Sequence, residues 1–245
     1  MIDVDGLTVR FGGVVSLSDV SVTFPSGICG LIGPNGAGKT TFFNVLSGFV
    51  TPASGMIKAD GVDLLTLPDF KRARWGVRRT FQTEQAIEGL SVFDNVATVY
   101  EHTAKGGGGA ARKAAVDEAL EFVGLVEVAN DLVRTLPAKE RRFIEMARAV
   151  VGEPRLVLLD EPGAGLPDEE TAQLSAIIRG IPERTGATVI LVDHDMELVQ
   201  ACCEWSAVLD FGRLLAWGPT AEVLADEKVL AAYLGGDEAL EETHS

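Results

Sequence analysis

The sequence predicts an α/β fold: a largely parallel sheet with helices on both faces, an N-terminal antiparallel β-subdomain and an inserted helical subdomain. Three short apolar runs, GICGLIG, RLVLLDE and ATVILVD, are typical of strands that are buried on both faces. Helical patterns alternate with these runs, as a parallel sheet requires. The first residues instead alternate between apolar and polar side chains, which predicts the antiparallel part.

The N-terminal half should begin with a hairpin. Its alternating pattern breaks at Gly12 and Gly13, which predicts two antiparallel strands joined by a turn. The other elements expected here are a buried strand at 27–33, a helix at about 38–48, strands near 54–60 and 76–82, and a short helix near 68–75.

The middle of the chain is helical in pattern and is interrupted by KGGGGAA, whose four glycines predict a flexible joint. After it come a strand at 155–161, a helix at 168–184, a strand at 187–193, a helix at 195–203 and a terminal hairpin. We therefore expect one domain over 1–245, with its core at 1–90 and 153–236, a helical subdomain at 91–152 and an acidic tail at 237–245.

Composition narrows the class of protein. The formal charge of −15 argues against a general nucleic-acid coat, which needs a basic surface, and leaves room only for a small basic site inside an acidic shell. The three cysteines, Cys29, Cys202 and Cys203, lack metal-ligand spacing and favour a reducing compartment. We find no apolar run long enough to span a bilayer, so any work at a membrane is expected to go through a partner.

The strongest motif is GPNGAGKTT, which follows an apolar strand and precedes a helix. It fits G-x-x-x-x-G-K-[ST], in which glycines let the backbone amides wrap a polyphosphate at a helix N-terminus. Lys39 should reach the β- and γ-phosphates, and Thr40 should bind Mg²⁺. The core is thus predicted to be that of a P-loop NTPase, with nucleotide contacts from Asn35, Gly36, Ala37, Gly38, Lys39, Thr40 and Thr41.

Two further groups of residues follow buried strands. In LVLLDEP, Asp160 stands at the carboxyl end of a strand, where a carboxylate can hold Mg²⁺. Glu161 comes next and could polarise an attacking water; the alternative is that the two carboxylates cap the next element. In ILVDHDMELV, His194 also follows a strand, and we expect it to contact the γ-phosphate, although a lone histidine is often structural.

These three motifs, in this order, resemble the ATP-binding subunits of ABC transporters over nearly the whole chain. The resemblance implies a head-to-tail dimer with two ATP molecules at its interface. Phe11 stands where the family stacks an aromatic ring on adenine, although a core phenylalanine would look the same. Gln82 in RTFQTEQ matches the glutamine that senses Mg²⁺ and signals to the membrane subunits. GAGLPD matches the loop that communicates between subunits, although Pro167 stands where the family usually has Asp or Asn.

Within the family, RFGGVVSLSDVS, FNVLSGF and AYLGG resemble the ATPases of branched-chain amino acid importers. That resemblance implies a second, non-identical ATPase, two membrane permeases and an external substrate-binding protein. It also implies a location at the cytoplasmic face of the cell membrane, through the permeases. Urea and amide importers look similar, so the substrate stays open. Catalysis is expected from Glu161, His194 and Lys39, and metal binding from Thr40, Gln82 and Asp160.

One segment departs from the family. The resemblance places the signature, usually about LSGGQ, at Leu136, Pro137, Ala138, Lys139 and Glu140. Proline has neither the hydroxyl nor the N–H with which a serine binds phosphate, and the signature glycines are replaced. We expect a heterodimer in which the site that uses this segment is degenerate. The alternatives are an ordinary solvated helix face here, and a regulatory or non-transport ABC protein with little hydrolysis.

Overall fold

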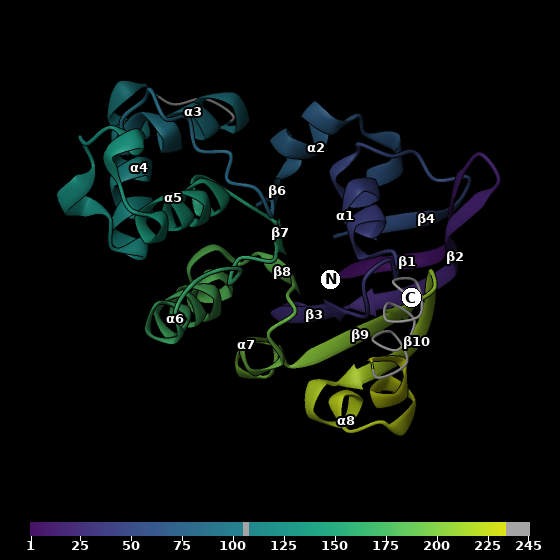
Figure 1. The fold of residues 1–245 in the computed structure, drawn as a ribbon. Helices are drawn as coiled ribbons and strands as arrows, with labels where there is room; N and C mark the ends of the chain where they lie inside the picture. Colours follow the sequence, from purple (N-terminus) through teal and green to yellow (C-terminus); the bar gives the residue numbers. More distant parts are fainter. Residues whose placement is uncertain (105–107, 234–245) are drawn as a thin grey trace.

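The computed structural model describes residues 1–104 and 108–233, and its strands form two sheets (Figure 1). The smaller sheet is antiparallel in the order β2-β1-β4-β5. Its strands are β1 (Ile2–Phe11), β2 (Val14–Phe24), β4 (Ser54–Ala59) and β5 (Val62–Asp63). The predicted N-terminal hairpin is present, with Gly12 in the left-handed region at its turn.

The larger sheet has the order β10-β9-β3-β8-β7-β6, and all its neighbouring strands are parallel except the β9–β10 pair. Its strands are β3 (Ile28–Ile32), β6 (Val77–Arg79), β7 (Leu156–Asp160), β8 (Thr188–Val192), β9 (Trp205–Asp210) and β10 (Arg213–Pro219). The parallel strands end at one edge of the sheet, where ligands bind in this class of fold.

Helices cover the larger sheet on one face, and α1 with the smaller sheet covers the other. Successive residues of β7 show this arrangement, because Leu158 packs toward α1 while Leu159 packs toward α5 and α6. The helices are α1 (Lys39–Ser47), α2 (Asp69–Trp75), α3 (Val92–Thr103), α4 (Gly109–Val123), α5 (Ala138–Val150), α6 (Asp168–Thr185), α7 (Met196–Cys202) and α8 (Thr220–Leu224). Short 3₁₀ turns lie at Leu64–Thr66, Val126–Val128 and Val133–Thr135.

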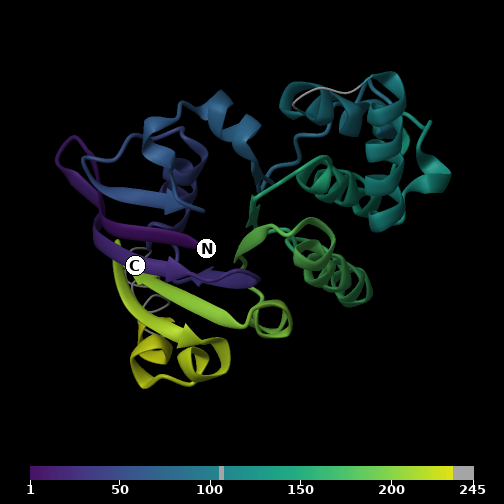
Figure 2. The same ribbon diagram turned by 180° about the vertical axis from the view of Figure 1, so that it is seen from behind.

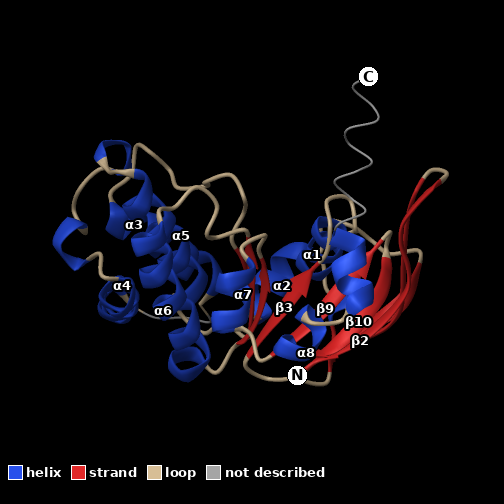
Figure 3. Ribbon diagram, turned by 60° about the horizontal axis from the view of Figure 1, so that its bottom comes forward, coloured by secondary structure: helices blue, strands red, loops and turns tan. Residues whose placement is uncertain are grey.

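Three helices, α3, α4 and α5, pack against one another and form a group beside the sheets. Figures 1 and 2 show this group on the opposite side of the molecule from the antiparallel sheet. In Figure 3, α3, α4, α5 and α6 lie on one side, and the strands of both sheets lie on the other side together with α1 and α8. Ser91 caps α3 by accepting a hydrogen bond from the Asp94 amide, at 3.0 Å.

The predicted fold class is confirmed by both sheets and by the covered faces. The element near 76–82 is shorter than expected, because β6 pairs only with β7 and ends at Arg79. Of the predicted glycine joint, Gly108 and Gly109 start α4, and 105–107 lie outside the described residues. The predicted acidic tail at 237–245 also lies outside them. Within the described part of the chain, no helix has the length and apolarity to cross a bilayer.

Candidate active site

The loop between β3 and α1 requires glycine at several positions. Gly36 and Gly38 have positive φ values of 78° and 107°, which other residues rarely adopt. A Cβ at Gly38 would lie 2.7 Å from Cδ2 of Leu17, and one at Gly33 would lie 2.1 Å from the Leu209 carbonyl oxygen. The loop therefore keeps this shape only with glycine, and it leaves Asn35 and Gly36 exposed.

Lys39 begins α1, and its ammonium group folds back over the loop. Its Nζ donates to the carbonyl oxygens of Gly33, at 2.5 Å, and Pro34, at 3.0 Å. Burial lowers the pKa of Lys39, while the nearby Glu161 and Asp160 oppose that shift. The cation lies where a phosphate cradled by the loop would need one.

The two threonines that follow have different surroundings. Thr40 is exposed at the second position of α1, so its hydroxyl is free to meet a ligand at the helix N-terminus. Thr41 is half-buried, and its Oγ1 lies 2.7 Å from Oγ of Ser16 on β2. This hydroxyl pair joins the loop to the N-terminal hairpin, whose exposed Phe11 ends β1.

Asp160 is held by an ion pair that the sequence motifs did not indicate. Arg79, at the end of the neighbouring strand β6, donates to Oδ2 of Asp160 at 2.8 Å. A second donor of Arg79 reaches Asn44 of α1 at 2.7 Å. The Arg79 and Asp160 side chains are only 6% and 10% exposed, so the pair is shielded from water.

Replacing Arg79 with alanine is expected to lower the free energy of unfolding by about 3–5 kcal/mol, because Asp160 would keep a buried charge without its partner. Urea denaturation measures the change. Arg179→Ala, at an exposed arginine of α6, is the matched control and should cost little. Adding Asp160→Asn to Arg79→Ala should restore part of the loss. A loss below about 1 kcal/mol in Arg79→Ala would show that the pair contributes little.

Glu161 is oriented by two side chains from different parts of the chain. Nε2 of Gln82 donates to its Oε2 at 2.8 Å, and Nε2 of His194 lies 3.0 Å from its Oε1. Glu161 has a φ of 49°, in the left-handed region, and its amide donates to the Val192 carbonyl at 2.7 Å. This strained backbone turns Glu161 away from the direction of Asp160 and costs on the order of 1–3 kcal/mol.

A second buried carboxylate supports this arrangement. Asp193 directly follows β8 and accepts hydrogen bonds from the amides of Gly163, at 3.1 Å, and Asp195, at 3.0 Å. Burial raises the pKa of Asp193, and the backbone hydrogen bonds oppose that shift. Asp193 thereby ties the loop after Glu161 to the loop that carries His194. Its place directly after an apolar strand was the available sequence signal, the same one that indicated Asp160.

The residues present fit a magnesium ion that is bound together with nucleotide phosphates. The described residues contain no group of three or more His, Cys, Asp or Glu that could hold a metal on its own. Mg²⁺ at nucleotide sites commonly takes one or two protein oxygens plus phosphate oxygens and waters. Asp160, whose second carboxylate oxygen does not face Arg79, and the exposed Thr40 hydroxyl supply ligands of that kind.

The segment predicted to be the signature forms the start of α5. Leu136 is buried, and Pro137 precedes the helix with no side-chain cap, so Ala138 is its first residue. The Lys139 ammonium lies 5.6 Å from the centre of the Phe143 ring. Figure 1 places α5 apart from α1, so this segment and the phosphate loop of the same chain belong to separate surfaces.

One salt bridge and one hydrogen bond connect α5 to the segment around Gln82. Nε of Arg141 lies 3.1 Å from Oε2 of Glu84, and Glu145 accepts from the Gln85 amide at 3.2 Å. Glu140, next to Arg141, is half-buried, and its Oε2 has no partner among the described residues. The predicted signature is therefore an ordered helix start that is joined to the glutamine loop.

The fold and the site together define the class of protein. Residues 17–164 match the family model described as ABC transporter. The chain belongs to the ATP-binding subunits of ABC transporters and is an ABC-type ATPase.

Particular relatives narrow this class. Residues 213–239 match the model of the branched-chain amino acid ATP-binding cassette transporter. The high-affinity branched-chain amino acid transport ATP-binding protein BraF of Pseudomonas aeruginosa is 36% identical, over 96% of this chain and 98% of that protein. The lipopolysaccharide export system ATP-binding protein LptB of Escherichia coli is also 36% identical, over 94% of this chain and 95% of the LptB chain.

The fold matches a solved ATP-binding cassette of an ABC transporter in its ADP conformation. The TM-score is 0.85 with 23% sequence identity, and the match covers 96% of this chain and 98% of that one. Identity at this level shows the shared fold alone.

Proposed function

We propose that this chain hydrolyses ATP to power a branched-chain amino acid importer. The observation that carries the catalytic part is Glu161, held between Gln82 and His194 beside the phosphate loop. Both hydrogen bonds fix the carboxylate at the end of β7, where an attacking water would stand opposite the γ-phosphate. The substrate part is supported by the match of residues 213–239 and by the similarity to BraF.

Each residue of the site has a role in this proposal. Lys39 leaves the Gly33 and Pro34 carbonyls and binds the β- and γ-phosphates, with amides of Gly36 to Thr40 around them. Glu161 orients the water and accepts its proton, while His194 holds Glu161 and contacts the γ-phosphate. Bound Mg²⁺ supplies charge neutralisation at the phosphates, with Thr40 and Asp160 as protein ligands and Gln82 beside it. Phe11 stacks on adenine.

The proposed complex contains this chain, a second and non-identical ATPase, two permeases and an external binding protein, with no nucleic acid. The chain would lie at the cytoplasmic face of the membrane, held there by the permeases. ATP-dependent uptake of labelled leucine into proteoliposomes that contain the whole complex tests the substrate. Uptake of urea or an amide without leucine uptake would favour the related importers, and activity without either would favour the LptB-like alternative.

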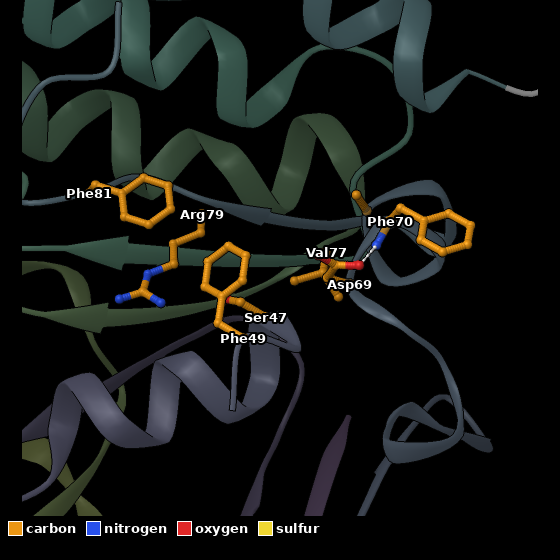
Figure 4. Close-up of a pocket in the computed structure, with 8 residues that line it drawn as sticks. Ser47, Phe49, Asp69, Phe70, Val77, Arg79 and Phe81 are labelled. Carbon is orange, nitrogen blue, oxygen red and sulfur yellow. Dashed lines mark hydrogen bonds between the residues drawn. The ribbon is translucent and has the colours of Figure 1, made fainter. Parts of the chain in front are cut away.

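A hollow beside the site suits a permease segment. This cavity of about 280 Å³ lies between α1, α2 and β6 (Figure 4). Phe49 and Phe70 line it although they are 57% and 54% exposed, and Phe49 stacks on Phe81 at a centroid distance of 6.2 Å. Phe81 precedes Gln82, and Arg79 also lines the cavity. An apolar permease side chain docked here would contact Arg79, the partner of Asp160, and would reach Gln82 through the neighbouring Phe81.

Replacing Phe49 and Phe70 with serine is expected to reduce recovery of the permeases with this chain by at least about tenfold, because two exposed rings would no longer be buried on binding. Co-purification after coexpression measures recovery. ATP binding by the isolated variant should stay unchanged. Leu230→Ser, at an exposed apolar residue away from the cavity, is the control. Equal recovery of the permeases by the double variant would place the docking surface elsewhere.

We further propose that the two ATP sites of the complex are unequal. One ATP site would use the phosphate loop of this chain, and this chain supplies it with a full set of residues: Lys39, Asp160, Glu161 and His194. The mirror site would use Pro137, Ala138 and Lys139 from this chain, which offer no hydroxyl and no glycine amide to a γ-phosphate. Cations at the start of α5 oppose the helix dipole by about 0.3–1 kcal/mol each, although Glu84 offsets Arg141. A partner with an intact signature would complete the working site.

A further inference from the structure

A second cavity lies at the opposite end of the larger sheet from the candidate active site. It has a volume of about 170 Å³ and is bounded by the ends of α2 and α3 and by the segments before β6 and β7. Arg155 precedes β7 and Asp160 ends it, so the strand separates the two by roughly 16 Å, at about 3.3 Å per residue. The cavity is therefore distinct from the nucleotide site.

Arginine dominates the lining of this cavity. Arg74, Arg78 and Arg155 all face it, together with the aromatic rings of Trp75 and Tyr100. The chain has 36 acidic and only 21 basic residues, so three arginines at one place are not a consequence of composition. Among the described residues, none of the three arginines makes a salt bridge.

Arg78 forms the buried floor of the cavity. Arg78 is only 7% exposed, and its Nε has no hydrogen-bond partner within residues 1–104 and 108–233. Burial lowers the pKa of Arg78 to about 10, and no carboxylate opposes this shift. A buried guanidinium without a salt-bridge partner is costly, so the described part of the chain holds a charge that a ligand could neutralise.

Capping of α2 uses only some of the hydrogen-bond donors of the Arg78 guanidinium. Its Nη1 donates to the carbonyl oxygens of Ala73, at 2.6 Å, and Val77, at 3.2 Å, at the end of α2. A guanidinium group carries five N–H donors on three nitrogens, so this cap uses one nitrogen and leaves the others. The exposed Arg155 lies over the ring of Trp75, at 5.4 Å, which keeps its guanidinium group at the cavity mouth. Arg74, also exposed, lines the cavity and lies 5.9 Å from the ring of Phe70, which is outside the lining.

We propose that this cavity binds a compact oxyanion, a carboxylate or phosphate group, with Arg78 at its floor and Arg74 and Arg155 at its mouth. The planar guanidinium fork matches both groups and binds them through two parallel hydrogen bonds. The volume suits a small metabolite and excludes a nucleotide triphosphate. Glu153, also in the lining, favours a ligand that carries an ammonium group beside its carboxylate.

An occupant would touch elements with different roles. Arg78 is followed by Arg79, the partner of Asp160, whereas Tyr100 belongs to α3 in the separate helical group. Binding would therefore join α3 to the strand that positions the catalytic carboxylates. Binding of the oxyanion does not depend on the proposed transport function. An effect of that binding on ATP hydrolysis would rest on the proposed function.

Titration calorimetry on the full chain tests the site. The background is Lys39→Ala, so that the phosphate loop does not compete for anions. Inorganic phosphate, 4-methyl-2-oxopentanoate and leucine are the probes, each at constant ionic strength set with sodium chloride. We expect at least one to bind with a Kd below about 1 mM, equal to roughly −4 kcal/mol. Phosphate binding identifies a phosphate-bearing ligand, and the other two probes identify a keto acid or an amino acid.

Variants locate the binding. Arg78→Gln and Arg155→Gln should each raise the Kd at least about tenfold, and Arg155 is exposed, so its variant should fold even if Arg78→Gln does not. Arg213→Gln, at an exposed arginine of β10, is the control and should leave the Kd unchanged. Absence of binding by all three probes at about 10 mM would overturn the proposal. Binding that Arg155→Gln does not weaken would overturn it as well.

Discussion

Replacing Glu161 with glutamine is expected to slow ATP hydrolysis by the assembled complex on the order of 10²–10⁴-fold, because the variant loses the group that accepts the proton of the attacking water. ATP binding should be retained, since Lys39 and the loop amides proposed to bind the phosphates are unchanged, while Glu161 is hydrogen-bonded to Gln82 and His194. Glutamine keeps the shape and can still bond to both neighbours, so the change isolates proton transfer from packing. Phosphate release at saturating ATP measures the rate, and nucleotide titration measures binding.

The control for this experiment is Glu197→Gln, at an exposed glutamate near the start of α7. It removes the same charge at a position that does not contact the site. Full activity is expected from it. A Glu161→Gln complex that keeps more than about a tenth of the activity would show that another group accepts the proton.

Replacing Lys39 with alanine is expected to weaken ATP binding at least about 100-fold, or roughly 3 kcal/mol, through lost hydrogen bonds from a charged donor to the phosphates. The lysine is buried, its Nζ is 2.5 Å from the Gly33 carbonyl, and burial lowers its pKa. A phosphate that replaces these carbonyl contacts would restore an ionic partner to the cation.

Equilibrium binding of a fluorescent ATP analogue measures the Lys39 effect. Lys58→Ala, at an exposed lysine of β4, is the matched control and should bind normally. Near-normal binding by Lys39→Ala would remove the phosphate loop from the nucleotide site. Loss of folding is excluded by comparing the urea midpoints of the two variants.

The strands and the phosphate motif could be predicted from the sequence, because each is specified by residues that are consecutive in the chain. The three apolar runs correspond to β3, β7 and β8, and the phosphate motif lies between β3 and α1 as expected. The partner of Asp160 could not be read in this way. Arg79 lies 81 positions away in sequence, and only the pairing of β6 with β7 brings it to the carboxylate.

Backbone strain was another feature beyond the reach of sequence patterns. Nothing in the sequence indicated the left-handed φ of Glu161 or the hydrogen bond from its amide to the Val192 carbonyl. The contacts of the basic side chains at the start of α5 could not be predicted from the sequence either. Lys139 lies over Phe143, and Arg141 pairs with Glu84, so two of the cations crowded there have partners within the chain.

The most direct test of the unequal-site proposal is ATP hydrolysis by two mixed complexes, each with one glutamate-to-glutamine change. One complex carries Glu161→Gln in this chain, and the other carries the equivalent change in its partner ATPase. The proposal predicts near-complete loss of hydrolysis in the first complex and more than about half of the activity in the second, because the mirror site faces Pro137 and Lys139. Equal and severe losses in both complexes would contradict it.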